Sequence, residues 1–93
     1  MEIKNQTDAR GGNFFMEDND QQIGLMHYAF SGPHKMIIIH TEVDEAYEGK
    51  GIGMKLVKAG VEYARDHQMK ILPLCPFAKK IFDITPAFAD VLF

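Results

Sequence analysis

Apolar and polar residues in the first half of the chain form three short segments separated by turns. Residues 13–17, 22–30 and 35–43 are rich in aromatic and β-branched side chains, a composition typical of β-strands. Turn-forming residues at 18–20 and 31–34 separate these segments. Because both turns are short, the strands are predicted to form an antiparallel meander. Segment 35–43 is the most apolar, which predicts a place inside the sheet, away from its edges.

The spacing of apolar residues changes to that of a helix in the second half of the chain. Between residues 51 and 67 the apolar side chains form one stripe, with lysines on the opposite side. Residues 70–75 again have the composition of a strand. Pro73 has no N–H to donate, which predicts that this strand lies at an edge or splays from its neighbour. Short helices are predicted at residues 76–83 and in the last turn or two of residues 86–93.

The order of these elements predicts a mixed α/β fold. The long helix joins strand 35–43 to strand 70–75, and such a connection makes the two strands parallel with a right-handed crossover. The chain has 93 residues, enough for one modest core. Residues 1–93 are therefore expected to form a single domain.

Composition argues against several classes of function. The formal net charge is −3 and no basic stripe is interleaved with aromatic residues, so no nucleic-acid partner is expected. The single cysteine, Cys75, excludes an internal disulfide and a tetrahedral cysteine metal site, and no metal is expected. No apolar run approaches the ~20 residues of a membrane helix and no signal peptide is recognisable, which predicts a cytoplasmic protein without a membrane partner. The edge strand weakened by Pro73 leaves a monomer and a homodimer both open.

A glycine-rich turn at residues 48–53, with the sequence Glu-Gly-Lys-Gly-Ile-Gly, connects the apolar strand to the long helix. Alternating glycines let the backbone approach a ligand closely. The first N–H groups of a helix have no partners within it and carry the positive end of its dipole, so the turn is predicted to bind a phosphate or pyrophosphate. Lys50 adds a positive charge. The alternative is an ordinary tight connection that binds nothing.

Two common phosphate-binding motifs do not fit this turn. A P-loop requires Gly-x-x-x-x-Gly-Lys-Ser/Thr, but Lys50 is followed by Gly51 and no upstream glycine is correctly placed. A dinucleotide-binding fingerprint requires Gly-x-Gly-x-x-Gly, but Met54 stands where the third glycine is needed. Residues 51–53, Gly-Ile-Gly, instead resemble the Gln/Arg-x-x-Gly-x-Gly/Ala signature of the GNAT acetyltransferases. Glu48 departs from it, since that family usually has glutamine or arginine at this position.

Three further segments resemble the small single-domain members of the GNAT family: residues 40–43, 73–77 and 85–90. The resemblance covers residues 22–93. It implies a GNAT-like fold and acetyl-coenzyme A as the substrate, with the pyrophosphate held by the turn at Glu48, Gly49, Lys50, Gly51, Ile52 and Gly53. It also implies that backbone groups of Thr41, Glu42 and Val43 hold the pantetheine arm.

Three residues are candidates for the chemistry. The carboxyl ends of two parallel strands meet at one edge of a sheet, which places Cys75 near His40 and Glu42. The Cys75 thiolate is predicted to attack the acetyl group, or the thiol to protonate the departing coenzyme; the alternative is a small buried hydrophobic residue. Glu42 is a candidate general base for an acceptor amine, and His40 is a second base or a group that orients Cys75. The alternatives are a polar strand end for Glu42 and a hydrogen-bonded surface histidine for His40.

These features predict an acetyltransferase-like protein that transfers acetyl from acetyl-coenzyme A to an unidentified amine acceptor. The chain is expected to lack the N-terminal helices that help to form an acceptor site in larger relatives. A non-catalytic module that binds coenzyme A or senses acyl groups is therefore the second hypothesis. The third is a structural or partner-binding module whose glycine turn binds nothing.

Overall fold

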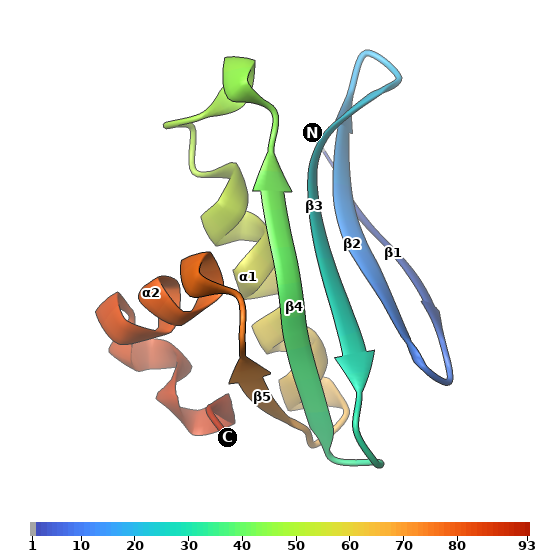
Figure 1. The fold of residues 1–93 in the computed structure, drawn as a ribbon, viewed down its shortest axis with the longest axis vertical. Helices are drawn as coiled ribbons and strands as arrows, with labels where there is room; N and C mark the ends of the chain where they lie inside the picture. The colour runs from blue at the N-terminus through green and yellow to red at the C-terminus, as the bar shows by residue number, and fades with distance from the viewer. Residues whose placement is uncertain (1) are drawn as a thin grey trace.

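The computed structural model describes residues 2–93 and contains a mixed sheet whose strands follow the order of the chain, β1-β2-β3-β4-β5. The strands are β1 (Glu2–Asp8), β2 (Gly11–Asp18), β3 (Gln21–Phe30), β4 (Lys35–Val43) and β5 (Lys70–Pro73). The first four pair antiparallel, and β5 pairs parallel to β4 (Figure 1). The antiparallel meander, the interior position of residues 35–43 and the parallel strand at the edge are therefore confirmed.

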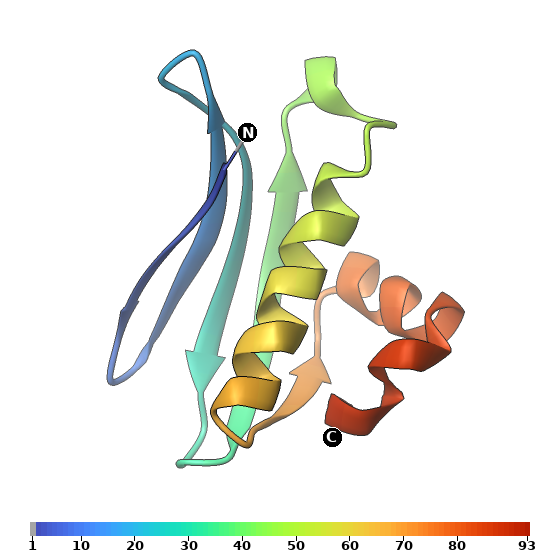
Figure 2. The same ribbon diagram turned by 180° about the vertical axis from the view of Figure 1, so that it is seen from behind.

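The long helix lies against one face of this sheet. This helix, α1 (Ile52–Asp66), follows a short 3-10 helix, η1 (Glu45–Tyr47), and lies in front of β4 in Figure 2. Helix α2 (Pro76–Ile84) and the 3-10 helix η2 (Pro86–Val91) contact α1 and β5 near the edge of the sheet. The predicted long helix and the short C-terminal helices are thus confirmed within one or two residues.

The sequence pattern did not predict strand β1. Every side chain in β1 except that of Ile3 is exposed, so the alternation of apolar and polar residues that marks a half-buried strand is missing. The strand forms because it pairs with β2 over its whole length, from Glu2 to Asp8. It is also anchored by the fully buried Tyr28, whose hydroxyl donates a hydrogen bond to Asn5 Oδ1 at 2.6 Å.

A β-bulge in β4 determines which side chains face the core. Ile38 and His40 pair with consecutive residues of β3, which leaves Ile39 with no partner on that strand. The extra residue reverses the alternation of side chains along the strand. Ile38 is fully buried, and Thr41 follows it onto the core face, whereas His40 and Glu42 lie on the exposed face.

Strand β5 separates from β4 halfway along β4. Their pairing ends at Ile38 opposite Pro73, and the Ile38 carbonyl then accepts the N–H groups of both Leu74 and Cys75, at 3.0 and 3.1 Å. Proline cannot donate to the ladder, so the strand cannot continue in register. Among residues 2–93, the last residues of β4 therefore have β3 on one side and no strand on the other.

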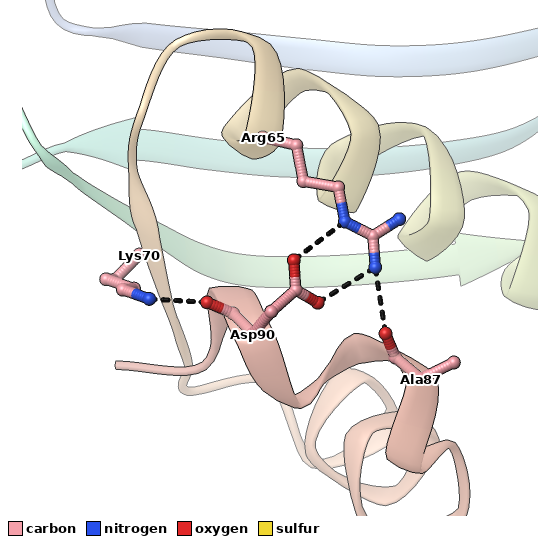
Figure 3. Close-up of polar contacts among 4 residues, drawn as sticks. All are labelled: Arg65, Lys70, Ala87 and Asp90. Carbon is pink, nitrogen blue, oxygen red and sulfur yellow. Dashed lines mark hydrogen bonds and ion pairs between the residues drawn. The ribbon is translucent and has the colours of Figure 1, made fainter.

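Side chains from the sheet, α1, α2 and η2 form a continuous hydrophobic core. Its fully buried members include Met26, Leu56 and Ile71. Polar contacts fasten the C-terminal segment to it: the Arg65 guanidinium binds the Asp90 carboxylate and a backbone carbonyl, and Lys70 donates to the Asp90 carbonyl (Figure 3). Within residues 2–93, no helix has both the length and the apolar character needed to cross a membrane.

Candidate functional site

A cavity of about 670 Å³ lies between the end of β4, the glycine turn and α2. Its lining residues are Thr41, Glu42 and Val43 from β4, Tyr47, Glu48, Gly49 and Gly51 from η1 and the turn, Ile52, Gly53 and Met54 from α1, and Phe77 and Ile81 from α2. The cavity lies beside the part of β4 that β5 has left, so the departure of the chain at Pro73 makes room for it. Its volume is in the range of small-molecule and cofactor sites.

The glycine turn presents backbone atoms to this cavity. Gly49 and Gly51 have left-handed backbone angles, with φ of 79° and 77°. A Cβ on either residue would meet no heavy atom within 4 Å, so the space in front of both is open. Gly51 is the N-cap of α1, and within residues 2–93 no side chain caps this end of the helix. The first N–H groups of α1 therefore have no acceptor within the helix, and together with the helix dipole they favour an anion here.

Gly53 has a different role from the other two glycines. Its missing side chain makes room for the ring of Phe77, whose Cζ would lie 2.3 Å from a Cβ on Gly53. The ring is 40% exposed and forms part of the cavity wall. Gly53 therefore shapes the cavity by allowing α2 to approach α1.

The side chain of Lys50 is absent from the cavity wall. Its Nζ lies 5.4 Å from the centre of the Tyr47 ring, as in a cation–π contact. The charged residues that do line the cavity are Glu42 and Glu48. Attraction for a phosphate must therefore come mainly from backbone N–H groups and the helix dipole.

Cys75 lies at the beginning of α2, as its N-cap, and is 5% exposed. Burial raises the pKa of its thiol, but the N–H groups of Ala78 and Phe77 and the hydroxyl and backbone of Thr41 lower it by more. The pKa of Cys75 is therefore below the ordinary cysteine value. A lowered pKa increases the fraction of thiolate, the form that acts as a nucleophile.

His40 and Glu42 form a pair on the exposed face of β4. His40 Nε2 lies 3.1 Å from Glu42 Oε2, and the side chains are 58% and 60% exposed. A smaller hollow of about 250 Å³ is lined by Glu42, Val43 and Asp44 together with residues 22–24 of β3. Glu42 lines both this hollow and the larger cavity, so it lies where a second molecule approaching from solvent would meet the cavity.

Most of the sequence-predicted site residues come together around one cavity. Of the predicted coenzyme-binding residues, Thr41, Val43, Glu48, Gly49, Gly51, Ile52 and Gly53 line it, and Lys50 does not. Of the predicted catalytic residues, Glu42 lines the cavity, His40 pairs with Glu42 on the outer face, and Cys75 is buried close to Thr41.

Four residues that line the cavity were not predicted from the sequence. Tyr47, Met54, Phe77 and Ile81 line the cavity, and none was assigned a role. The spacing of Phe77 and Ile81, four residues apart, places both on one side of α2 and was a usable signal. Among the described residues, no group of three or more histidine, cysteine, aspartate or glutamate side chains is arranged to hold a metal ion.

Comparison with known proteins assigns the chain to a family. The family model described as GCN5-related N-acetyl-transferase matches residues 13–91, and the chain belongs to this family. Protein NATD1 of Gallus gallus is 29% identical over 62 residues, which cover 67% of this chain and 56% of NATD1. The chain thus matches little more than half of the length of that relative.

Solved structures agree on the fold. A GCN5-like protein of Staphylococcus aureus, solved in solution, is 33% identical and superposes with a TM-score of 0.77, over 99% of this chain and 87% of the other. A Bacillus anthracis protein described as a streptothricin acetyltransferase, in complex with acetyl coenzyme A, is 19% identical. It superposes with a TM-score of 0.62 over 71% of this chain and 39% of its own, which supports the fold alone.

Proposed function

We propose that the protein binds acetyl-coenzyme A in the cavity beside β4 and transfers its acetyl group to an amine. The observation that carries this proposal is the open glycine turn at the N-terminus of α1, next to a cavity bounded by the unpaired side of β4. The turn is suited to a pyrophosphate, and the end of β4 offers backbone groups to an extended pantetheine arm. Membership of the N-acetyltransferase family supports the choice of ligand.

The chain's own residues would carry out both steps in the cavity. The Cys75 thiolate attacks the thioester carbonyl, the bond from that carbon to the coenzyme sulfur breaks, and coenzyme A leaves as a thiolate. An amine that enters the cavity past Glu42 then attacks the acetyl group on Cys75, Glu42 accepts the proton that the nitrogen loses, and the Cys75 thiolate is released. His40 beside Glu42 orients the carboxylate.

Native mass spectrometry with and without acetyl-coenzyme A tests this proposal. The expected result is a bound coenzyme followed by a gain of one acetyl group on the protein, and loss of that gain in Cys75→Ala. The single cysteine makes the assignment unambiguous. If calorimetry at high ligand concentration detects no binding of coenzyme A, the proposal fails as a whole.

A non-catalytic module that binds coenzyme A is the second candidate. The observation that favours it is the 5% exposure of Cys75, which is also absent from the residues that line the cavity. Coenzyme bound by both the unmodified protein and Cys75→Ala, without acetylation of the protein or of any amine in a screen, would favour this candidate over the enzyme.

A further inference from the structure

Glu48 places a negative charge on the wall of the cavity, next to the glycine turn. The residue is exposed, and among residues 2–93 its carboxylate forms no ion pair. Within the same part of the chain, the residues that line the cavity include no lysine, arginine or histidine. An anion that enters the cavity therefore meets this carboxylate without a cationic side chain on the wall to offset it.

The backbone holds Glu48 close to the place where a phosphate would bind. Glu48 is the C-cap of η1, and its N–H donates to the Glu45 carbonyl at 3.3 Å. It directly precedes Gly49 and stands three residues before Gly51, the N-cap of α1. Three peptide units span at most about 11 Å, so both glycines lie within that distance of the Glu48 Cα. This distance is comparable with the ~8–10 Å over which exposed charges act at ordinary ionic strength.

The two lysines nearest to the turn in sequence do not line the cavity. Lys50 Nζ lies 5.4 Å from the centre of the Tyr47 ring, and Lys55 is exposed on α1. The other carboxylate on the wall, that of Glu42, is at the end of β4 and lies 3.1 Å from His40 Nε2. The carboxylate next to the glycine turn is therefore the charged group on the wall that a phosphate bound there would meet first.

We infer that Glu48 is a specificity-determining residue, which weakens the binding of ligands that place a phosphate at the glycine turn. The backbone N–H groups attract the phosphate and the carboxylate repels it, so the affinity reflects the difference between two opposing effects. Lower affinity mainly means faster dissociation, so Glu48 would speed the release of coenzyme A after its acetyl group has been transferred. The inference concerns the ligand of the same cavity and so rests on the proposed function.

The test is calorimetry of coenzyme A binding to the unmodified protein and to Glu48→Gln, which keeps the size of the side chain and removes its charge. At low ionic strength we expect Glu48→Gln to bind roughly three- to tenfold more tightly, the range for one charge several ångströms from a phosphate. In ~1 M salt, which screens charges beyond about 3 Å, most of this gain should disappear. Pantetheine, which has no phosphate, should gain nothing from the substitution. The matched control is Glu45→Gln, which removes the same charge from a position on η1 that lines neither hollow, and it should tighten binding by less than about twofold.

The outcomes separate this role from a structural one and from failure of the proposed function. Equal affinity of the unmodified protein and Glu48→Gln for coenzyme A, both folded by circular dichroism, would overturn the inference and leave the proposed function standing. So would an equal gain in Glu45→Gln, for pantetheine or in high salt, because none of these follows from local repulsion of a phosphate. If neither protein binds coenzyme A, the proposed function fails and the inference fails with it. If Glu48→Gln does not fold, Glu48→Ala is measured by the same criteria.

Discussion

The ring of Phe77 occupies the space that a side chain on Gly53 would need, with Cζ 2.3 Å from the position of a Cβ. Two opposing effects meet at this contact. Alanine is a better helix former than glycine by up to about 1 kcal/mol, and Gly53 lies in the first turn of α1. The clash with Phe77 acts in the opposite direction, because the ring must leave its position in the cavity wall.

The effect of Gly53→Ala on the free energy of unfolding is therefore expected to have opposite signs in the presence and absence of the Phe77 ring. In the unmodified protein it should lower the free energy of unfolding, and in Phe77→Ala it should raise that free energy by up to about 1 kcal/mol. Chemical denaturation of the two single variants, the double variant and the unmodified protein measures both effects. An effect of the same sign in both backgrounds would show that the two residues do not interact as described.

Gly49→Ala should weaken binding of coenzyme A by roughly tenfold, the equivalent of one distorted hydrogen bond to a charged group. The new methyl group would stand in the open space between the turn and the cavity. Gly32→Ala is the matched control: Gly32 has a φ of 72° and open space in front of it, but it lies in the β3–β4 turn, at the other end of β4. Calorimetry should show a similar loss of thermal stability in both variants, because both introduce the same backbone strain. Binding of coenzyme A should be weaker only in Gly49→Ala.

Glu42→Gln should lower the rate of acetyl transfer to an amine by about 10²–10⁴-fold, the contribution of a general base. Binding of coenzyme A should change little, because the amide retains the size of the carboxylate. Glu45→Gln removes the same charge from a neighbouring exposed position that lines neither hollow, and it should keep the rate. Equal losses in the two variants would indicate a general effect of charge.

The pH dependence of stability should report the contact between Arg65 and Asp90. Arg65 Nε and Nη2 donate to the two carboxylate oxygens at 2.9 and 2.8 Å, and these bonds hold the pKa of Asp90 below its ordinary value. A carboxyl whose pKa is lowered by folding stabilises the protein above its unfolded pKa. That contribution is lost as the pH falls through the folded value.

Thermal unfolding measured across the acid range tests this contact. The melting temperature of the unmodified protein should fall as the pH drops below the ordinary aspartate pKa, and that of Asp90→Asn should fall less. Asp90→Asn should also melt lower at neutral pH, where the charged pair is intact. If the melting temperatures of the two proteins fell in parallel as the pH is lowered, Asp90 would not be the cause of the acid destabilisation.

Tyr28→Phe should lower the free energy of unfolding by about 1 kcal/mol, because it removes the donor for Asn5 in β1. Amide hydrogen exchange should accelerate in β1 more than in β3, since β1 is an edge strand and this bond is one of its few anchors. Unchanged exchange in β1 would mean that pairing with β2 alone holds the strand.

Much of the fold could be predicted because composition, turn residues and the helical spacing of apolar side chains mark its elements. Aromatic and β-branched segments between turns marked β2, β3 and β4, the helical stripe marked α1, and Pro73 marked the strand that leaves the sheet. Strand β1 was not predicted, because it is held by backbone pairing with β2 and by the hydrogen bond from Tyr28 to Asn5. Neither interaction leaves an apolar pattern in the sequence.

The site was less predictable, because parts of it depend on which face of an element a residue occupies. The glycine turn was recognisable from its spacing, but the contact of Gly53 with Phe77 depends on how α2 packs. The sequence suggested His40 and Glu42 as the companions of Cys75. The structure pairs those two with each other on the exposed face of β4 and holds buried Cys75 against the Ile38 carbonyl, because a bulge shifts the alternation by one residue.

The unpaired Ile39 is 44% exposed, so its side chain contributes little to the core. Sequence drift in descendants of this chain should therefore leave the identity of residue 39 free. Losing its codon would place Thr41 two residues after Ile38, so regular alternation would keep the acid–histidine pair outside and the hydroxyl on the core side. Strand β4 should therefore tolerate both a substitution and the loss of one residue at this position.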